Sequence, residues 1–153
     1  MHRQFLSMVL LPFVLGSLVL ANGMALPAEQ GNKDADESKL IGTWKLVSAK
    51  YGNREFDVSK LGTTLKHITP TSFVWVSYDA ETKVVSRTAG GTYTLKGDQY
   101  EEIPQYGLSS DFDLIRDKPQ SFKFKIEGDK WHHNGALSSG LKIEEVWERC
   151  KKE

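Results

Sequence analysis

Short runs of β-branched and aromatic residues fill the chain from Leu40 onward, and Gly, Asp, Asn and Pro separate them about every ten residues. No long segment repeats the apolar period of a helix. Residues 57–62 predict a single helical turn that ends at Gly62 and lies between the first two strands. The pattern predicts strands at residues 41–51, 64–69, 72–78, 83–89, 91–96, 99–103, 112–116, 121–127, 130–135 and 142–150.

The turns between these strands predict how the sheet is arranged. Gly97-Asp98 and Gly128-Asp129 place glycine first in a two-residue turn, which suits the type II′ hairpin. Because the hairpins are tight, strands that are adjacent in sequence are adjacent in the sheet. No helices are predicted to cover a flat sheet, so closing the sheet into a barrel is the simplest way to remove its exposed edges. We therefore predict an all-β fold, an antiparallel up-and-down meander β-barrel of about eight to ten strands.

The hairpin turns also predict which residues face the barrel interior, because directly opposed residues of an antiparallel pair share a face. Around Gly128-Asp129, Phe124 opposes His133, and the alternation of apolar residues with lysines predicts that both point inward. Around Gly97-Asp98, Tyr93 opposes Glu102, which predicts that Glu102 is inside.

Two other strands complete the predicted interior. On the last strand, an inward Trp147 implies an inward Glu145. On residues 72–78, the face with the large rings is predicted inside, with Phe73, Trp75 and Ser77 opposite Val84, Ser86 and Thr88.

The predicted interior therefore combines large rings with three polar exceptions. Charged groups are rarely buried without a partner or water, so these exceptions predict a hydrated cavity, an ion pair with Arg149 or Arg87, or a binding site. The interior residues are Trp44, Trp75, Tyr93, Tyr100, Phe122, Phe124, Trp131 and Trp147, with Glu102, His133 and Glu145 as the polar set.

The N-terminal segment differs from the rest of the chain. A basic start at Met1-His2-Arg3 precedes an apolar run from Phe5 to Ala21, and small residues allow cleavage after Ala25. We predict a signal peptide at residues 1–25, a disordered spacer at 26–38 and the barrel domain at 39–153. The mature protein is then secreted or periplasmic, with no membrane attachment after cleavage.

The charge pattern argues against a nucleic-acid partner, and the cysteine content excludes an intrachain disulfide. The chain carries 20 basic and 20 acidic side chains, with Lys interleaved among Glu and Asp, so a nucleic-acid partner is not predicted. Cys150 is the only cysteine, so no intrachain disulfide can form.

The two ends of the predicted barrel resemble the calycin superfamily, the lipocalins and fatty-acid-binding proteins. The first strand carries Gly42-Thr43-Trp44, and the last carries Val146-Trp147-Glu148-Arg149. The resemblance implies that Arg149 packs over Trp44 and closes one end of the barrel, with Gly42 and Trp147 part of this closure. A guanidinium over an indole gains cation–π attraction. The whole chain also looks like uncharacterised lipocalin-like proteins secreted by bacteria.

One departure from that resemblance concerns the ligand. Fatty-acid-binding proteins typically present Arg-x-Tyr on the last strand to hold a carboxylate, and the matching positions here are Glu145 and Trp147. A bound carboxylate beside Glu145 would bring two negative charges together in low dielectric. The portal helix pair of that family is also reduced to the turn near Val58.

These observations leave three functions open. The first is binding of a small, largely apolar or aromatic molecule in the barrel, with the cavity lined by Trp75, Tyr93, Tyr100, Glu102, Phe122, Phe124, Trp131, His133 and Glu145. The second is a metal- or haem-associated barrel or a small enzyme that uses His133 with Glu102 and Glu145. The third is a protein-interaction scaffold with a filled barrel, using residues 105–118. No local metal or nucleophile motif occurs, so neither a cofactor, a metal ligand nor a catalytic residue is predicted.

Overall fold

The computed structural model describes residues 38–108 and 112–151. The predicted signal peptide lies outside the described residues, as does the predicted spacer up to residue 37. Ser38, the last residue of that spacer, is helical together with residues 39 and 40.

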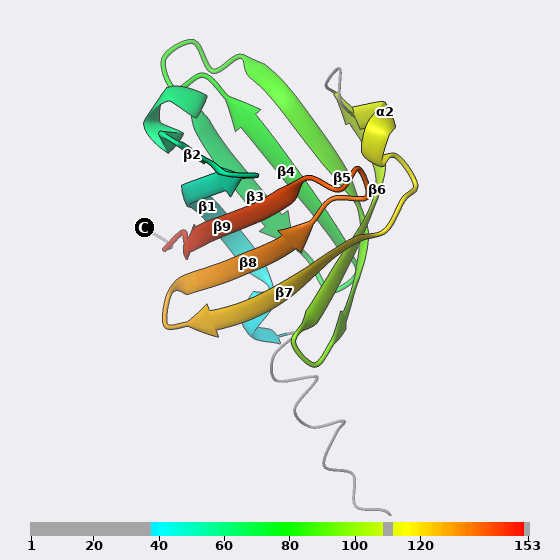
Figure 1. The fold of residues 1–153 in the computed structure, drawn as a ribbon. Coiled ribbons are helices and arrows are strands. Elements are labelled where there is room, and N and C mark those ends of the chain that lie inside the picture. The colour runs from blue at the N-terminus through cyan, green and yellow to red at the C-terminus, as the bar shows by residue number, and fades with distance from the viewer. Residues whose placement is uncertain (1–37, 109–111, 152–153) are drawn as a thin grey trace, which may run out of the picture.

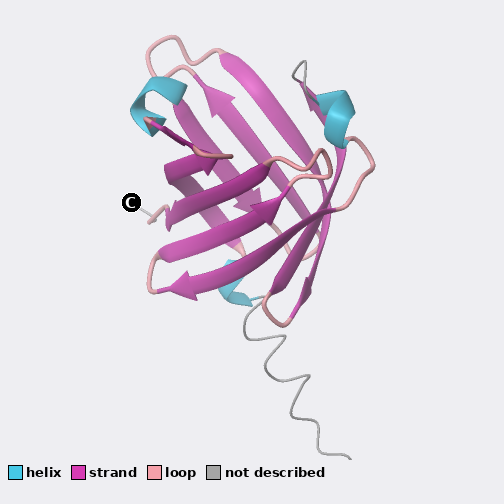
Figure 2. Ribbon diagram, in the orientation of Figure 1, coloured by secondary structure: helices cyan, strands magenta, loops and turns pink. Residues whose placement is uncertain are grey.

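The described chain consists mostly of antiparallel strands (Figures 1 and 2). The strands are β1 (Gly42–Tyr51), β2 (Arg54–Phe56), β3 (Thr63–Ile68), β4 (Ser72–Tyr78), β5 (Val85–Lys96), β6 (Gln99–Leu108), β7 (Gln120–Glu127), β8 (Lys130–Ala136) and β9 (Lys142–Arg149). Besides the helical residues 38–40, two short helical segments accompany them, the 3₁₀ helix η1 (Val58–Leu61) and the α-helix α2 (Phe112–Ile115).

The strands follow one another around the sheet in sequence order from β3 to β9, and β1 pairs with both β3 and β9. This double pairing closes eight strands into a barrel, and β2 is an extra strand that pairs with β1 (Figure 1). The predicted all-β meander barrel is therefore confirmed. The predicted helical turn is also present as η1, where the Asp57 carboxylate accepts a hydrogen bond from the Ser59 amide at 3.1 Å.

Three predicted strand assignments are wrong. The predicted strands 83–89 and 91–96 form one continuous strand, β5. Gly90 and Gly91 are not a turn but the place where β6 bulges close to β5, since a Cβ on Gly91 would lie 2.0 Å from the Ile103 carbonyl oxygen. The predicted strand 112–116 is helix α2, which buries Phe112 and exposes Leu114. Strand β2 falls in a segment that was predicted to be a loop.

The predicted pairing of β4 with the next strand is also wrong. Phe73, Trp75 and Ser77 oppose Gly91, Ala89 and Arg87, rather than the predicted set of Val84, Ser86 and Thr88. The cause is the β4–β5 loop, in which the Asp79 side chain accepts from the amides of residues 81 and 82 and a bulge follows Ser77. The face is nevertheless the predicted one, because Phe73 and Ser77 are buried and Trp75 is half-buried against the core.

One end of the barrel is closed by contacts between the first and last strands. The guanidinium of Arg149 lies 4.1 Å from the Trp44 ring centroid and donates to the Ile41 carbonyl at 3.0 Å and to the Lys39 carbonyl. Trp44 is fully buried, and its indole nitrogen donates to the Leu40 carbonyl at 2.8 Å. Gly42 has a φ of 142°, and a Cβ there would lie 2.7 Å from the Arg149 Nη1, so glycine leaves room for the guanidinium.

The other end is the mouth, where η1, α2 and the β4–β5 loop lie (Figure 1). Toward the mouth β6 and β7 separate, because they pair over four residue pairs only, from Gln99–Lys123 beside the β5–β6 turn to Glu102–Gln120. Phe112 of α2 packs against β6 at Gly107, where a Cβ would lie 2.6 Å from the Phe112 ring. None of the helices in residues 38–108 and 112–151 is long and apolar enough to cross a membrane.

Replacing Arg149 with alanine should lower the free energy of unfolding by about 1 to 2 kcal/mol, because it removes the cation–π contact and two bonds to carbonyls. Urea denaturation followed by circular dichroism measures this change. Lys151→Ala, which removes an exposed ion pair with Asp129, should change stability little. Equal effects of the two substitutions would show that Arg149 does not close the barrel.

Candidate functional site

The structure places the residues of the predicted cavity lining in the barrel interior. Trp75 is half-buried, and all the others are at most 9% exposed: Tyr93, Tyr100, Glu102, Phe122, Phe124, Trp131, His133 and Glu145. Trp44 and Trp147 are buried beside them. The pairings predicted for the hairpins at Gly97 and Gly128 are those observed, including Phe124 with His133 and Tyr93 with Glu102.

The middle of the interior is a cluster of rings around Trp131. The centroid of its ring lies 5.3 Å from that of Tyr100, 5.1 Å from that of His133 and 5.6 Å from that of Trp44. His133 also lies 3.9 Å from Phe122. These distances are those of packed aromatic pairs, so these rings contact one another directly in the middle of the barrel.

An ion pair lies inside this ring cluster. The Lys66 ammonium contacts the Glu102 carboxylate at 2.6 Å, and the two side chains are 3% and 6% exposed. Tyr100 donates a second bond to the same Glu102 oxygen at 2.8 Å. The ammonium also lies 5.1 Å from the ring centroids of both Trp131 and Trp147. Glu102 is therefore partnered, and the rings around Lys66 add cation–π attraction.

Lys66 was not among the predicted site residues, and the expected ion pairs of the interior carboxylates with Arg149 or Arg87 are not those observed. Arg149 lies over Trp44, and Arg87 is exposed. The sequence did carry a signal for Lys66. A turn at Pro70-Thr71 pairs Lys66 with Trp75, so an inward Trp75 implies an inward Lys66, as the observed register shows.

The second interior carboxylate, Glu145, is held by three donors. Tyr51 donates to its Oε1 at 2.9 Å, while His133 Nδ1 and Trp147 Nε1 both lie 3.0 Å from its Oε2. Tyr51 was not predicted as a site residue. It lies near the end of β1 beyond a bulge at Leu46–Ser48, which changes the alternation on which a face prediction depends.

Burial and these partners determine the charge of each group. Burial lowers the pKa of His133, and the nearby Lys66 lowers it further, against the opposing effect of Glu145. Burial alone would raise the pKa of Glu145, but its bonds from His133 and Tyr51 and the charge of Lys66 bring the pKa below its usual value. At neutral pH His133 is therefore neutral and donates through Nδ1, and Glu145 is ionised.

The two tyrosines of this network keep their protons. Burial raises the pKa of Tyr51 and of Tyr100, and the adjacent carboxylate, Glu145 or Glu102, raises each further. Both phenols are therefore hydrogen-bond donors to an ionised carboxylate.

The predicted grouping of His133 with both Glu102 and Glu145 does not form. His133 bonds to Glu145, whereas Glu102 bonds to Lys66 and Tyr100. Within residues 38–108 and 112–151, no three His, Cys, Asp or Glu side chains are placed to hold one metal ion. The arrangement is two separate polar pairs rather than a three-ligand site.

Within the described part of the chain, two buried polar atoms of the ring cluster have no hydrogen-bond partner, Nε1 of Trp131 and Nε2 of His133. The first is an N–H donor. The second is an acceptor, because neutral His133 carries its proton on Nδ1. Buried polar groups in proteins are almost always paired, and each unpaired one costs about 1 to 3 kcal/mol. The interior thus offers one donor and one acceptor that the chain itself does not use.

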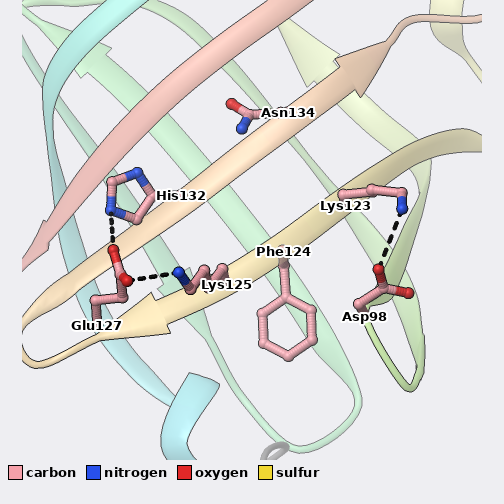
Figure 3. Close-up of a pocket in the computed structure, with 7 residues that line it drawn as sticks. All are labelled: Asp98, Lys123, Phe124, Lys125, Glu127, His132 and Asn134. Carbon is pink, nitrogen blue, oxygen red and sulfur yellow. Dashed lines mark ion pairs between the residues drawn. The ribbon is translucent and has the colours of Figure 1, made fainter.

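A surface pocket of about 440 Å³ lies on the outer face of β7 and β8, near the β5–β6 turn (Figure 3). Its charged side chains are already paired, Lys123 with Asp98 at 3.3 Å and Glu127 with Lys125 at 2.6 Å and with His132 at 3.3 Å. These groups are exposed to solvent, which weakens their attraction for a ligand. The interior is therefore the stronger candidate site.

The segment 105–118, predicted as a possible interaction surface, divides into two kinds of residue. Phe112 is buried, whereas Tyr106 and Leu114 are 55% and 56% exposed. Residues 109–111 of this segment lie outside the described residues.

Replacing Lys66 with methionine should destabilise the protein by about 3 to 5 kcal/mol, because Glu102 is left as an unpaired buried charge. Adding Glu102→Gln to this variant should restore much of the loss. Guanidinium denaturation of the single and double variants measures both effects. Lys50→Met, which breaks the exposed pair with Glu144, is the control and should cost less than about 1 kcal/mol. A small effect of Lys66→Met would mean that the buried pair is not formed.

Stability should fall as the pH is lowered through 6.5, the ordinary pKa of histidine. Below that pH the unfolded chain takes up a proton that folded His133 does not, so unfolding is favoured by up to about 1.4 kcal/mol per pH unit. Melting temperatures across this range measure the effect. His133→Gln should flatten the dependence, and His132→Gln, on the outer face of β8, should keep it. An equal slope in His133→Gln would refute this assignment.

No protein-family model matches the chain, and no curated protein sequence matches it. Solved structures do match. A lipocalin-like protein from Bacteroides uniformis has a TM-score of 0.50 and 16% identity, over 72% of this chain and 98% of that chain. An uncharacterized protein from Bacteroides eggerthii has a TM-score of 0.51 and 17% identity, over the same shares. At these identities the likeness concerns the fold alone, which is a lipocalin-like β-barrel in these structures and in this chain.

Proposed function

We propose that this protein binds a small, largely apolar or aromatic molecule inside its barrel, and that it does so after export. The observation that carries the proposal is the pair of unpartnered polar atoms, Trp131 Nε1 and His133 Nε2, within the interior cluster of rings. A few polar groups in an apolar lining are typical of ligand sites, where they orient the ligand.

The mouth half of the barrel supports the same proposal. Trp75 lies on the inward face opposite Lys66, and Tyr51 bonds to the interior carboxylate Glu145. Both side chains pack against the core but are only half-buried. A largely apolar molecule would cover ring surface that the protein's own packing leaves exposed, which is the main source of binding free energy for such ligands.

Export rests on the predicted signal peptide at residues 1–25. In this proposal the protein carries or captures its ligand outside the cytoplasm, and catalysis is not part of its role.

Binding should quench the intrinsic fluorescence, because the chain has four tryptophans and all four, at positions 44, 75, 131 and 147, line the interior. The test titrates the protein with three dyes of different charge, anionic 8-anilinonaphthalene-1-sulfonate, neutral Nile red and cationic auramine O. Trp75→Ala should weaken binding of the dye that binds best by about tenfold or more, a loss of about 1.4 kcal/mol. Tyr106→Ala, which removes an exposed ring on the outside of the barrel, should leave it unchanged.

Native mass spectrometry of protein made with its leader provides the second measurement. We expect a mature chain that begins at Leu26 and a fraction with a bound small molecule. An empty protein that quenches with none of the three dyes would refute the binding proposal, and a chain that keeps residues 1–25 would refute export.

A further inference from the structure

The buried charges of the barrel interior do not balance. Lys66 and Glu102 neutralise each other at 2.6 Å. Glu145 has no such counter-ion, because its three partners are a phenol, an indole and an imidazole. Among the described residues, the charged side chains that are buried are Lys66, Glu102 and Glu145, together with the titratable His133. The interior therefore holds one carboxylate in excess.

Other cations near the interior do not remove this excess. Arg149 is engaged at the closed end by Trp44 and two backbone carbonyls. Arg87 takes an inward register position opposite Ser77 but is exposed, so solvent screens its charge. Its influence reaches Tyr51, whose pKa it lowers slightly against the larger effects of burial and Glu145.

Trp131 Nε1 is an unpaired donor in the ring cluster, and the other open hydrogen-bonding positions are acceptors on Glu145 and His133. An ionised carboxylate has about four lone-pair sites. Tyr51, His133 and Trp147 occupy three sites on Glu145, and the open one is on Oε1, the oxygen that Tyr51 contacts. The Nε2 of His133 is a second free acceptor, buried and without a partner. Both acceptors require a donor, and neither can serve an anion.

The rings of the interior favour the same kind of ligand. The face of an aromatic ring attracts cations and repels anions. The interior already holds one ammonium in this way, since Lys66 lies 5.1 to 5.9 Å from the ring centroids of Phe73, Tyr100, Trp131 and Trp147. A second ammonium would meet an aromatic lining and an unbalanced carboxylate together.

We propose that the ligand of this barrel is an organic cation, a protonated amine with an apolar or aromatic body, and that Glu145 is its counter-ion. The inference rests on the proposed binding function and names its ligand class. The ammonium N–H groups donate to Glu145 Oε1, and the apolar body of the ligand lies against Trp75 and Tyr51. A fatty-acid carboxylate, by contrast, would face Glu145 and find Lys66 already engaged by Glu102.

The test compares ligands that share a shape and differ in charge. Calorimetry and tryptophan quenching at neutral pH measure the affinity of 2-phenylethylamine, 2-phenylethanol and 3-phenylpropanoate, and of straight-chain amines, alcohols and carboxylates from butyl to dodecyl. For each shape we expect the amine to bind about tenfold or more tightly than the alcohol, and the carboxylate to bind most weakly.

Two variants at neighbouring positions distinguish the effect of the interior carboxylate on binding from the effect of the protein's net charge. Glu145→Gln should remove the preference for amine over alcohol and leave the alcohol affinity within about threefold. Glu144→Gln removes the same charge from the outer face of β9, where Glu144 is 59% exposed, and should keep the preference. If Glu145→Gln does not fold, the ranking of the three ligand classes by the natural protein still decides the proposal.

Each result has one meaning. The proposal of a cationic ligand is refuted if an alcohol or carboxylate binds as tightly as the matched amine. It is also refuted if Glu145→Gln still prefers the amine over the alcohol. Binding of the dyes without binding of any amine would refute the proposal of a cationic ligand but would leave the proposed binding function intact. Failure of every dye and every ligand in the series refutes both.

Discussion

The interior of this barrel depends on one constraint, which is that a charge taken out of water must be given a partner. Lys66 satisfies it through Glu102 at 2.6 Å and through the surrounding rings. Glu145 satisfies it only in part, through neutral donors from β1, β8 and β9. The ion pair of Lys66, the protonated Nδ1 of His133 and the open acceptor atoms all follow from how these two carboxylates are accommodated.

The same constraint separates this barrel from a solid hydrophobic core. Leucine or phenylalanine in place of the polar set would fill the interior without a desolvation cost, and such replacements often stabilise proteins. The chain instead places Glu102, His133 and Glu145 among its largest rings. The proposed role in ligand binding would explain why polar residues occupy these interior positions, which packing alone does not explain.

Much of this architecture could be predicted from the sequence because it depends on local rules. The turns at Gly97 and Gly128 fixed the register of two hairpins, and that register placed Glu102 and His133 inside. Prediction was wrong where a bulge interrupts the regular pairing of two strands. The glycines at 90 and 91 allow β6 to bulge against β5, and in the sequence this glycine pair was interpreted as a turn. The β4–β5 loop shifted the partners of Trp75.

The pairing inside the site was harder to predict for a different reason. Lys66 and Glu102 are 36 residues apart and lie on β3 and β6, so no hairpin relates them. They meet only because the sheet curves into a barrel and brings opposite walls together. Which inward groups touch across the interior therefore depends on the size and closure of the barrel, and strand alternation does not contain that information.

The contact of Arg149 with Trp44 and with the carbonyls of residues 39 and 41 also affects how the chain folds. It joins segments more than a hundred residues apart, and the β1–β9 ladder beside it has the same span. The entropy of closing so long a loop must be offset before either contact stabilises the chain, which makes folding slow for a domain of this size. During synthesis β1 emerges early, and β2 and β3 can pair with one edge of it, but its other edge has no partner until β9 is complete. Closure of the barrel therefore waits for the final strand.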